Sequence, residues 1–375
     1  MRFRIRISMI VVCMFAVLAI TVQASAQRLI TFDAPHSGTN AGQGTQSTGI
    51  NLLGTITGNV TDNNFGTHGF VRTPDGKFTD FDVPGANPVL GCTCPDSIND
   101  RGVVTGYDID TNGVGHGFLR TPDDGEISTF DVPEAGTGAS QGTYPVGITI
   151  FGVVAGYYVD PSNVSHGFLR TADGEIRTFD VSEAGTSAYQ GTTPGGLNNL
   201  GAIAGYYVDV NYVIHGFLRT SDGKITTFDA PATVGASFGT VPYAINDVAV
   251  VAGYFFDSNN RSHSFLRTPD GQFTVFEAPR AGKAIYKGTY TEGTFATAIN
   301  LSGATTGFVI DKNAEAHSFV RTGNGEAITF DIPGQIAAPG TDFGSAGEAI
   351  NAAGQIAGRW RDTNQVLHGF LRSVN

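Results

Sequence analysis

Seven histidines, each with an aspartate six positions before it, are the residues of this sequence most suited to chemistry. They belong to one recurring block, Gly-x3-Asp-x5-His-[Gly/Ser]-Phe-[Leu/Val]-Arg-[Thr/Ser]. A metal site needs three or four ligands that converge on one point, whereas histidines on adjacent sheets should lie roughly 12 Å apart. We therefore predict no metal at these residues and interpret each pair as a structural contact that braces a hairpin. The pairs are Asp62/His68, Asp110/His116, Asp160/His166, Asp209/His215, Asp257/His263, Asp311/His317 and Asp362/His368.

The same aspartates begin a second pattern, Asp-x-Asn, in every block except the third, which reads Asp160-Pro-Ser-Asn163. Alternating oxygen ligands are typical of calcium loops, but calcium takes six to eight oxygens and each loop offers about three. An Asx turn explains the pattern with fewer assumptions. Calcium remains the alternative cofactor.

No catalytic residue is assigned from the sequence. There is no His-Glu-x-x-His motif and no glycine loop of the phosphate-binding kind. The arginine of each block and the acid of each Phe-Asp pair recur with every copy, whereas an active site needs asymmetry, so we interpret them as packing residues. A pair of carboxylates distant in sequence, as in glycoside hydrolysis, stays open.

The block recurs every 48 to 54 residues, the period of propeller blades. Each copy has the pattern of four short strands. Across the Asp222-Gly223 turn we expect Phe217 to lie opposite Phe228, with Leu218 and Ile225 on the other face. In the fourth copy the expected strands are 191–198, 202–209, 215–220 and 225–230.

The two ends of the chain predict how the copies are arranged. The last copy stops at Asn375 without a fourth strand, and the segment 29–35 (LITFDAP) matches the missing strand, as 225–231 (ITTFDAP) shows. An open stack would leave an edge strand unpaired. The sequence therefore predicts an all-β, seven-bladed β-propeller of four-stranded antiparallel blades, closed by the N-terminal strand in the last blade. Its units lie near 36–84, 85–133, 134–182, 183–231, 232–279, 280–333 and 334–375 plus 29–35, within a single domain, 27–375.

The motifs HGF, at His68, His116, His166, His215 and His368, and HSF, at His263 and His317, resemble the HAF-type repeat of bacterial extracellular proteins. That family is named for a His-Ala-Phe core followed by an aliphatic residue. Here Gly or Ser replaces the Ala, and Arg-Thr stands where a Trp is common. The resemblance implies an exported bacterial repeat protein and adds little chemistry.

The first 26 residues have the pattern of a signal peptide. Three arginines precede the apolar run 9–22, and Ala24-Ser25-Ala26 fits the small-residue cleavage rule. Beyond this segment, 19 Lys and Arg face 34 Asp and Glu, a net charge of −15. Such a surface repels phosphate backbones, so nucleic acid is not expected as a partner. No second apolar run follows, and we expect a secreted, periplasmic or cell-surface protein with no membrane span after cleavage.

Two cysteines remain after this segment, Cys92 and Cys94. An oxidising compartment favours a disulfide between them. Further soft ligands that a metal-binding pair would need are missing from the local sequence.

Function, if it is local, should lie where the copies differ. The loops between blades vary most and share one face with the Asp-x-Asn loops, and loops on a rigid scaffold commonly carry binding. We predict a binding or scaffold module for a glycan or a protein, and the alternative is a hydrolase or lyase with its site at the mouth of the channel. The candidate ligand-binding residues are Tyr144, Tyr189, Tyr243, Tyr286, Lys287 and Tyr290.

Overall fold

The computed structural model describes residues 27–86, 92–231, 233, 239–283, 285–286, 290–336 and 344–374. The predicted signal peptide, Lys287 and the side chains of Tyr286 and Tyr290 lie outside the described residues. Within these ranges every regular element is a strand, so the fold is all-β as predicted. None of the described segments forms a helix long and apolar enough to cross a bilayer.

The strands follow one another in antiparallel sets of four, one set for each sequence unit. The seventh set takes its fourth strand from the N-terminal segment. From the first unit to the seventh, the sets are β2 (Gly44–Ile50), β3 (Ile56–Thr61), β4 (Thr67–Arg72) and β5 (Phe78–Phe81); β6 (Thr93–Ile98), β7 (Val104–Ile109), β8 (Gly115–Arg120) and β9 (Ile127–Phe130); β10 (Gly142–Ile148), β11 (Val154–Val159), β12 (Ser165–Arg170) and β13 (Ile176–Phe179); β14 (Gly191–Leu197), β15 (Ile203–Val208), β16 (Ile214–Arg219) and β17 (Ile225–Phe228); β18 (Thr240–Ile245), β19 (Val251–Phe256), β20 (Ser262–Arg267) and β21 (Phe273–Phe276); β24 (Gly293–Ile299), β25 (Thr305–Ile310), β26 (Ala316–Arg321) and β27 (Ala327–Phe330); and β28 (Ser345–Ile350), β29 (Ile356–Arg361), β30 (Leu367–Val374) and β1 (Gln27–Phe32). A short hairpin, β22 (Ile285–Tyr286) and β23 (Tyr290–Thr291), lies between the fifth and sixth sets.

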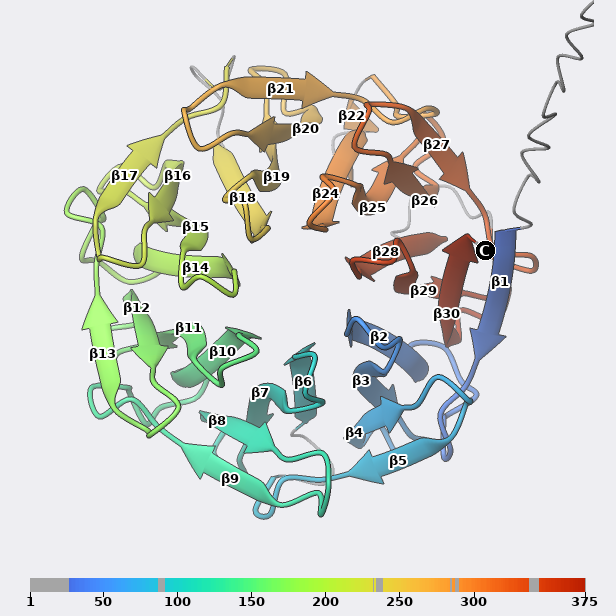
Figure 1. The fold of residues 1–375 in the computed structure, drawn as a ribbon, viewed down its shortest axis with the longest axis horizontal. Helices are drawn as coiled ribbons and strands as arrows, with labels where there is room; N and C mark the ends of the chain where they lie inside the picture. The colour runs from blue at the N-terminus through green and yellow to red at the C-terminus, as the bar shows by residue number, and fades with distance from the viewer. Residues whose placement is uncertain are drawn as a thin grey trace, which may run out of the picture.

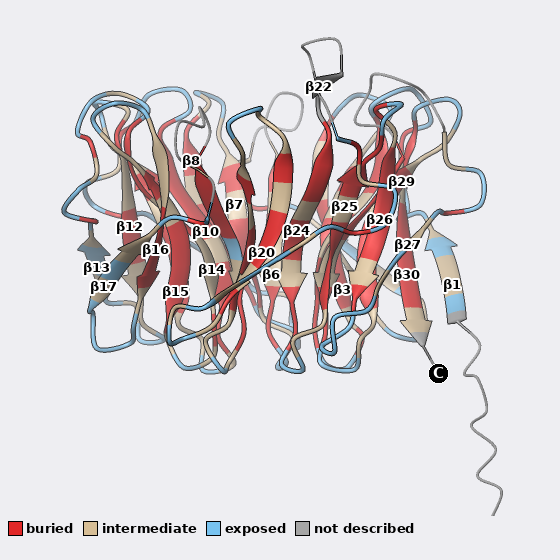
Figure 2. Ribbon diagram, turned by 90° about the horizontal axis from the view of Figure 1, so that it is seen from above, coloured by how far each residue is buried: buried red, intermediate tan, exposed pale blue. Residues whose placement is uncertain are grey.

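The sets are arranged around a central axis, with the first strand of each set innermost and the fourth outermost (Figure 1). Seen from the side, burial concentrates in the inner strands, and exposed residues gather in the loops and in outer strands such as β13 and β17 (Figure 2). Single parallel pairs, such as Gly115 with Gly142, join several neighbouring sets at one end. β1 pairs with β30 from Gln27↔Val374 to Phe32↔Gly369, which places the N-terminal segment beside the last copy as the sequence predicts.

The repeated phenylalanine of the HGF and HSF motifs forms the centre of every set. Phe217 and its equivalents have no exposed surface. The predicted register is wrong by one residue, because Phe217 lies opposite Thr227, Leu218 opposite Thr226, and Phe228 opposite Gly216. The hairpin loop is longer than the two residues assumed: Thr220 N donates to the Lys224 carbonyl, and Gly223 has a positive φ of 93°. Gly216 leaves room for the Phe228 ring, which would lie 2.6 Å from a Cβ at that position.

The repeated arginine packs between units. Each guanidinium lies over the ring of a phenylalanine on the outermost strand of the preceding set, as Arg120 does over Phe81 at 4.9 Å. Arg72 of the first unit lies 4.7 Å from the Phe32 ring of β1, so this contact joins the first set to the seventh set, of which β1 is the outermost strand. Desolvation of the buried Arg120 side chain lowers the pKa of its guanidinium. These contacts combine apolar burial with a cation–π attraction.

Asparagines form a belt at the face opposite the loops between units. The side chain of the first turn residue in one unit donates to the backbone carbonyl of the next, as Asn198 does to Asn246 at 2.9 Å. The same bond runs from Asn351 to the Asn51 carbonyl, 300 residues away, at 2.9 Å. The third unit has Thr149 at this position, so the sequence itself interrupts the pattern there.

Candidate functional site

Each repeated histidine lies between two carboxylates. Its Nδ1 is close to the acid that follows the outermost strand, as in His68 with Asp82 at 2.8 Å, and since a carboxylate only accepts, Nδ1 donates. The aspartate paired with it in the sequence analysis is more distant, with Nε2–Oδ2 separations of 3.6–3.9 Å in six units and 3.2 Å for His263–Asp257. The sequence analysis therefore missed the nearer partner. These partners are Asp82, Asp131, Asp180, Asp229, Glu277, Asp331 and Asp33.

The Asp-x-Asn loops have Asx-turn geometry. Asp62 Oδ1 accepts hydrogen bonds from the backbone N–H groups of Asn64 and Gly66, both at 2.8 Å. The same pair of bonds recurs at the other loops, for example from Asn211 and Val213 to Asp209. One oxygen of each aspartate is thus committed to holding its own loop.

The tyrosines proposed for ligand binding do not share one surface. Tyr144 is buried in β10, where its hydroxyl donates to the Gln141 carbonyl at 3.0 Å and its ring stacks on Tyr157. Tyr189 is 80% exposed in a loop between units. Tyr243 is on the innermost strand β18 rather than in a loop, and it lines the central cavity. Only the backbones of Tyr286 and Tyr290 are described, paired across the β22–β23 hairpin.

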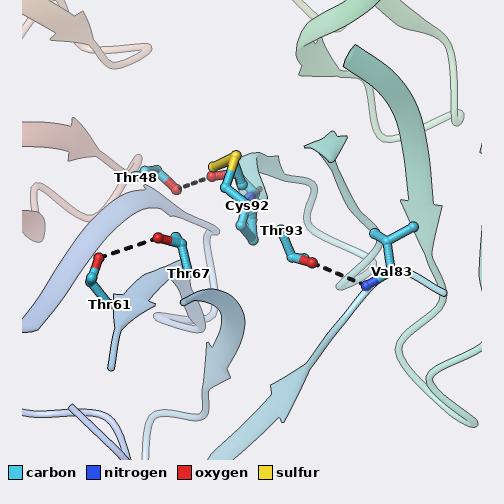
Figure 3. Close-up of a disulfide and its surroundings, with 8 residues drawn as sticks. Thr48, Thr61, Thr67, Val83, Cys92 and Thr93 are labelled. Carbon is cyan, nitrogen blue, oxygen red and sulfur yellow. Dashed lines mark hydrogen bonds between the residues drawn. A yellow bond between two sulfur atoms is a disulfide. The ribbon is translucent and has the colours of Figure 1, made fainter. Parts of the chain in front are cut away.

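Cys92 and Cys94 are joined by a disulfide at the start of β6, with their Cα atoms 5.5 Å apart (Figure 3). Beside it, Thr48 Oγ1 donates to the Pro95 carbonyl at 2.7 Å and links the innermost strands of the first two units. The disulfide therefore lies at the beginning of the innermost strand of the second unit.

The innermost strands share an irregularity that creates the candidate site. In each, the register to the second strand skips one residue, as between Ser47 and Gly49 in β2. A bulge of this kind redirects a side chain and interrupts the alternation of faces. The extra residue differs from unit to unit: Thr48, Asp96, Val146, Gly195, Tyr243, Thr297 and Glu348.

All of these residues except Thr297 line one cavity of about 690 Å³. The bulged residues that line it come from the innermost strands of six units, and these strands surround the central axis in Figure 1, so the cavity lies on that axis. Its lining divides into two sectors. A polar sector holds Gln46, Thr48, Asp96, Glu348 and Arg359, and an aromatic sector holds Tyr157, Tyr206, Tyr243, Tyr254 and Phe256.

The polar sector is electrostatically unusual. Burial raises the pKa of Asp96 to about 7, although the accessible surface of the residue shows it to be only partly buried. Glu348 Oε1 lies 2.9 Å from Arg359 Nε, and burial raises the pKa of Glu348 despite the attraction of that arginine. The cavity thus contains a carboxyl group that can hold or release a proton near neutral pH, together with an ion pair and several tyrosine hydroxyls.

Of the residues that line this cavity, the sequence analysis named only Tyr243 as a ligand-binding candidate. The available signal was the variation itself: the bulged position changes from Thr to Asp, Val, Gly, Tyr and Glu, while the Gly-Thr before it and the Ile-Asn after it recur in most units. The position of the bulge is not evident from the sequence, however, and a regular alternation of faces would assign the wrong residues to the axis.

Comparison with solved structures places the chain among propeller-type proteins. It is similar to virginiamycin B lyase from Staphylococcus aureus, with a TM-score of 0.57 and 15% identity over 93% of this chain and 100% of that one. A streptogramin B lyase gives 0.56 and 12% over 93% and 98%, and the BP39L lectin from Burkholderia pseudomallei gives 0.53 and 9% over 94% and 97%. At these identities the likeness shows the fold alone. No family model and no curated protein matches the sequence.

Proposed function

We propose that this chain is an exported, seven-bladed β-propeller, closed by β1 in the last blade, that binds a small hydroxyl-rich ligand of the glycan class in its central cavity. The closure is supported by the β1–β30 ladder, the Arg72–Phe32 contact and the Asn351–Asn51 hydrogen bond. Export is supported by the signal-peptide pattern in the first 26 residues.

The observation that carries the binding proposal is the residue at the bulge of each innermost strand. Its type differs between units, apart from a threonine that occurs in two of them, and in six of the seven units it lines the cavity. Glycans are recognised by aromatic rings that stack on the sugar and by polar groups that pair with its hydroxyls. The cavity supplies the aromatic faces with Tyr206, Tyr243 and Tyr254, and the polar groups with Gln46, Asp96 and Arg359. The binding site is thus moved from the long-loop face, where the sequence analysis expected it, to the axis.

The test is a glycan array on residues 27–375, followed by titration of the best ligand against two variants. Tyr243→Ala removes a ring from the cavity wall, and Tyr189→Ala, the matched control, removes an exposed ring from a loop. We expect Tyr243→Ala to weaken binding by at least about tenfold, the factor for about 1.4 kcal/mol, and Tyr189→Ala to leave it unchanged. The reverse result would return the site to the long-loop face.

A second candidate function is a hydrolase or lyase that acts on such a ligand. The specific observation is that two acids, Asp96 and Glu348, line the same cavity and that the pKa of Asp96 is near 7, the value suited to a general acid or base. The fold is compatible with either function, since the similar structures include two lyases and a lectin. Turnover of the bound glycan that disappears in Asp96→Asn while binding persists would establish catalysis.

A further inference from the structure

A buried side-chain cluster in the sixth unit lies outside the central cavity. His317 is 2% exposed, and Asp311 and Glu315 contribute carboxylates beside it. One ligand atom from each of the three residues lies within 4.8 Å of the other two. The cluster occupies the loop between β25 and β26 and the start of β26.

The histidine has a nitrogen available for a ligand. Its Nδ1 donates to Asp331 at 2.6 Å, which fixes the tautomer and leaves the lone pair on Nε2. Nε2 is buried without a hydrogen-bond partner, and the Asp311 Oδ2 atom lies 3.6 Å away. A buried polar nitrogen without a partner costs free energy, which a ligand at that point would recover.

The sixth unit differs from the others at one decisive position. Glu315 is four residues after the aspartate, where four other units have Val114, Val164, Val213 and Val366 and the remaining two have Gly66 and Arg261. In the seventh unit His368 Nε2 is also buried without a hydrogen-bond partner, but Val366 provides no third ligand. Among the described residues, the repeated His–Asp pair gains a third ligand only in the sixth unit.

The sequence analysis expected no metal at the His–Asp pairs because it found no converging third ligand, and Glu315 supplies one here. We propose that His317 Nε2, Asp311 and Glu315 bind one divalent transition-metal ion of the zinc class. Zinc sites of this kind have three protein ligands, from imidazole and carboxylate groups, with water in the fourth position. Bonds of about 2.0–2.2 Å place tetrahedral ligand atoms roughly 3.4 Å apart. The Asp311–His317 separation of 3.6 Å already approaches this value, so the half-buried Glu315 side chain makes the main adjustment.

Asp331 accepts the hydrogen bond from Nδ1, the histidine nitrogen that faces away from the proposed metal. A carboxylate on the far nitrogen of a metal-binding imidazole orients the ring and raises its basicity. Asp331 is itself held by Arg280, whose Nη1 lies 2.6 Å from Oδ2. The disulfide between Cys92 and Cys94 removes two thiolates that would otherwise compete for the same metal.

The experiment uses residues 27–375, stripped of metal with a chelator and titrated with Zn²⁺ by calorimetry. Co²⁺ absorption reports the coordination geometry. We expect one Zn²⁺ per chain, a tetrahedral Co²⁺ spectrum and an increase in Tm with Zn²⁺. Asp331→Asn should weaken Zn²⁺ binding by about 10–100-fold, and loss of the ligand in Glu315→Val should weaken it at least as much.

Glu315→Val introduces the residue that four other units already carry, so the variant should fold, which circular dichroism checks. The matched control is Asp362→Asn in the seventh unit, which should leave stoichiometry and affinity unchanged. Equal Zn²⁺ binding by wild type and Glu315→Val would overturn the proposal, as would the absence of Zn²⁺ binding to the metal-free wild type.

Discussion

The outer strands and the innermost strands of this molecule follow opposite rules. On the outer three strands the same contacts recur: a fully buried phenylalanine, an arginine over a phenylalanine of the neighbouring set, and a histidine on a carboxylate. On the innermost strands the bulged position differs between neighbouring units. A contact repeated in every unit stabilises every unit, whereas a ligand on the axis needs an asymmetric surface. The repeated contacts of the outer strands therefore stabilise the fold, and our proposal assigns ligand binding to the variable positions of the innermost strands.

The largest effect should follow from truncation of the repeated core. Phe217→Ala removes a ring with no exposed surface, and we expect it to lower the free energy of unfolding by about 3–5 kcal/mol. Tyr243→Ala, at the variable inner position, is 45% exposed and should cost less than about 1.5 kcal/mol. Urea unfolding of both variants measures the difference, and equal losses would contradict the division between the two regions.

An intermediate effect should appear in the pH dependence of the free energy of unfolding, through the titration of Asp96. Its pKa of about 7 in the folded protein is above the ordinary value of 3.8, so the folded state holds the proton more tightly. The stability gained in this way is complete below pH 4 and is lost as the pH rises to about 7.

Asp96→Asn cannot lose a proton, so its stability relative to wild type should increase by about 1–3 kcal/mol between pH 4 and pH 8. The full pKa shift at about 1.4 kcal/mol per unit sets the upper limit, and the partial exposure of Asp96 lowers the expected value. Unfolding in urea at several pH values measures this change. Asp123→Asn on an exposed outer turn is the control and should show no such trend. A flat difference for Asp96→Asn would mean that this carboxyl is not buried.

The smallest effect should come from restoring the contact that the asparagine belt lacks in the third unit. Thr149→Asn supplies the side-chain donor that the third unit lacks, and we expect a gain of up to about 1 kcal/mol. Asn351→Ala removes the bond to the Asn51 carbonyl and should cost about 1–3 kcal/mol. Thermal unfolding of the two variants measures both changes. A loss of stability in Thr149→Asn would show that this asparagine hydrogen bond does not stabilise every unit in which it can form.

The sequence predicts the repeated part of this structure well and the irregular part poorly. The expected strand 191–198 is observed as Gly191–Leu197, and the segment near Phe32 pairs with β30. The partner of His68 was missed because Asp82 is close only after the outermost strand folds back. The residues that face the axis were missed because a bulge shifts the alternation, and its position depends on the packing of neighbouring strands rather than on local residue types.

The central claim is that the ligand lies on the axis among the variable inner residues. A crystal structure of residues 27–375 with the best glycan from the array tests this most directly. We predict that the sugar contacts Asp96 and Tyr243 and lies beside the Glu348–Arg359 pair. A sugar bound instead at the loops around Tyr189, with the axis filled by water, would contradict the account.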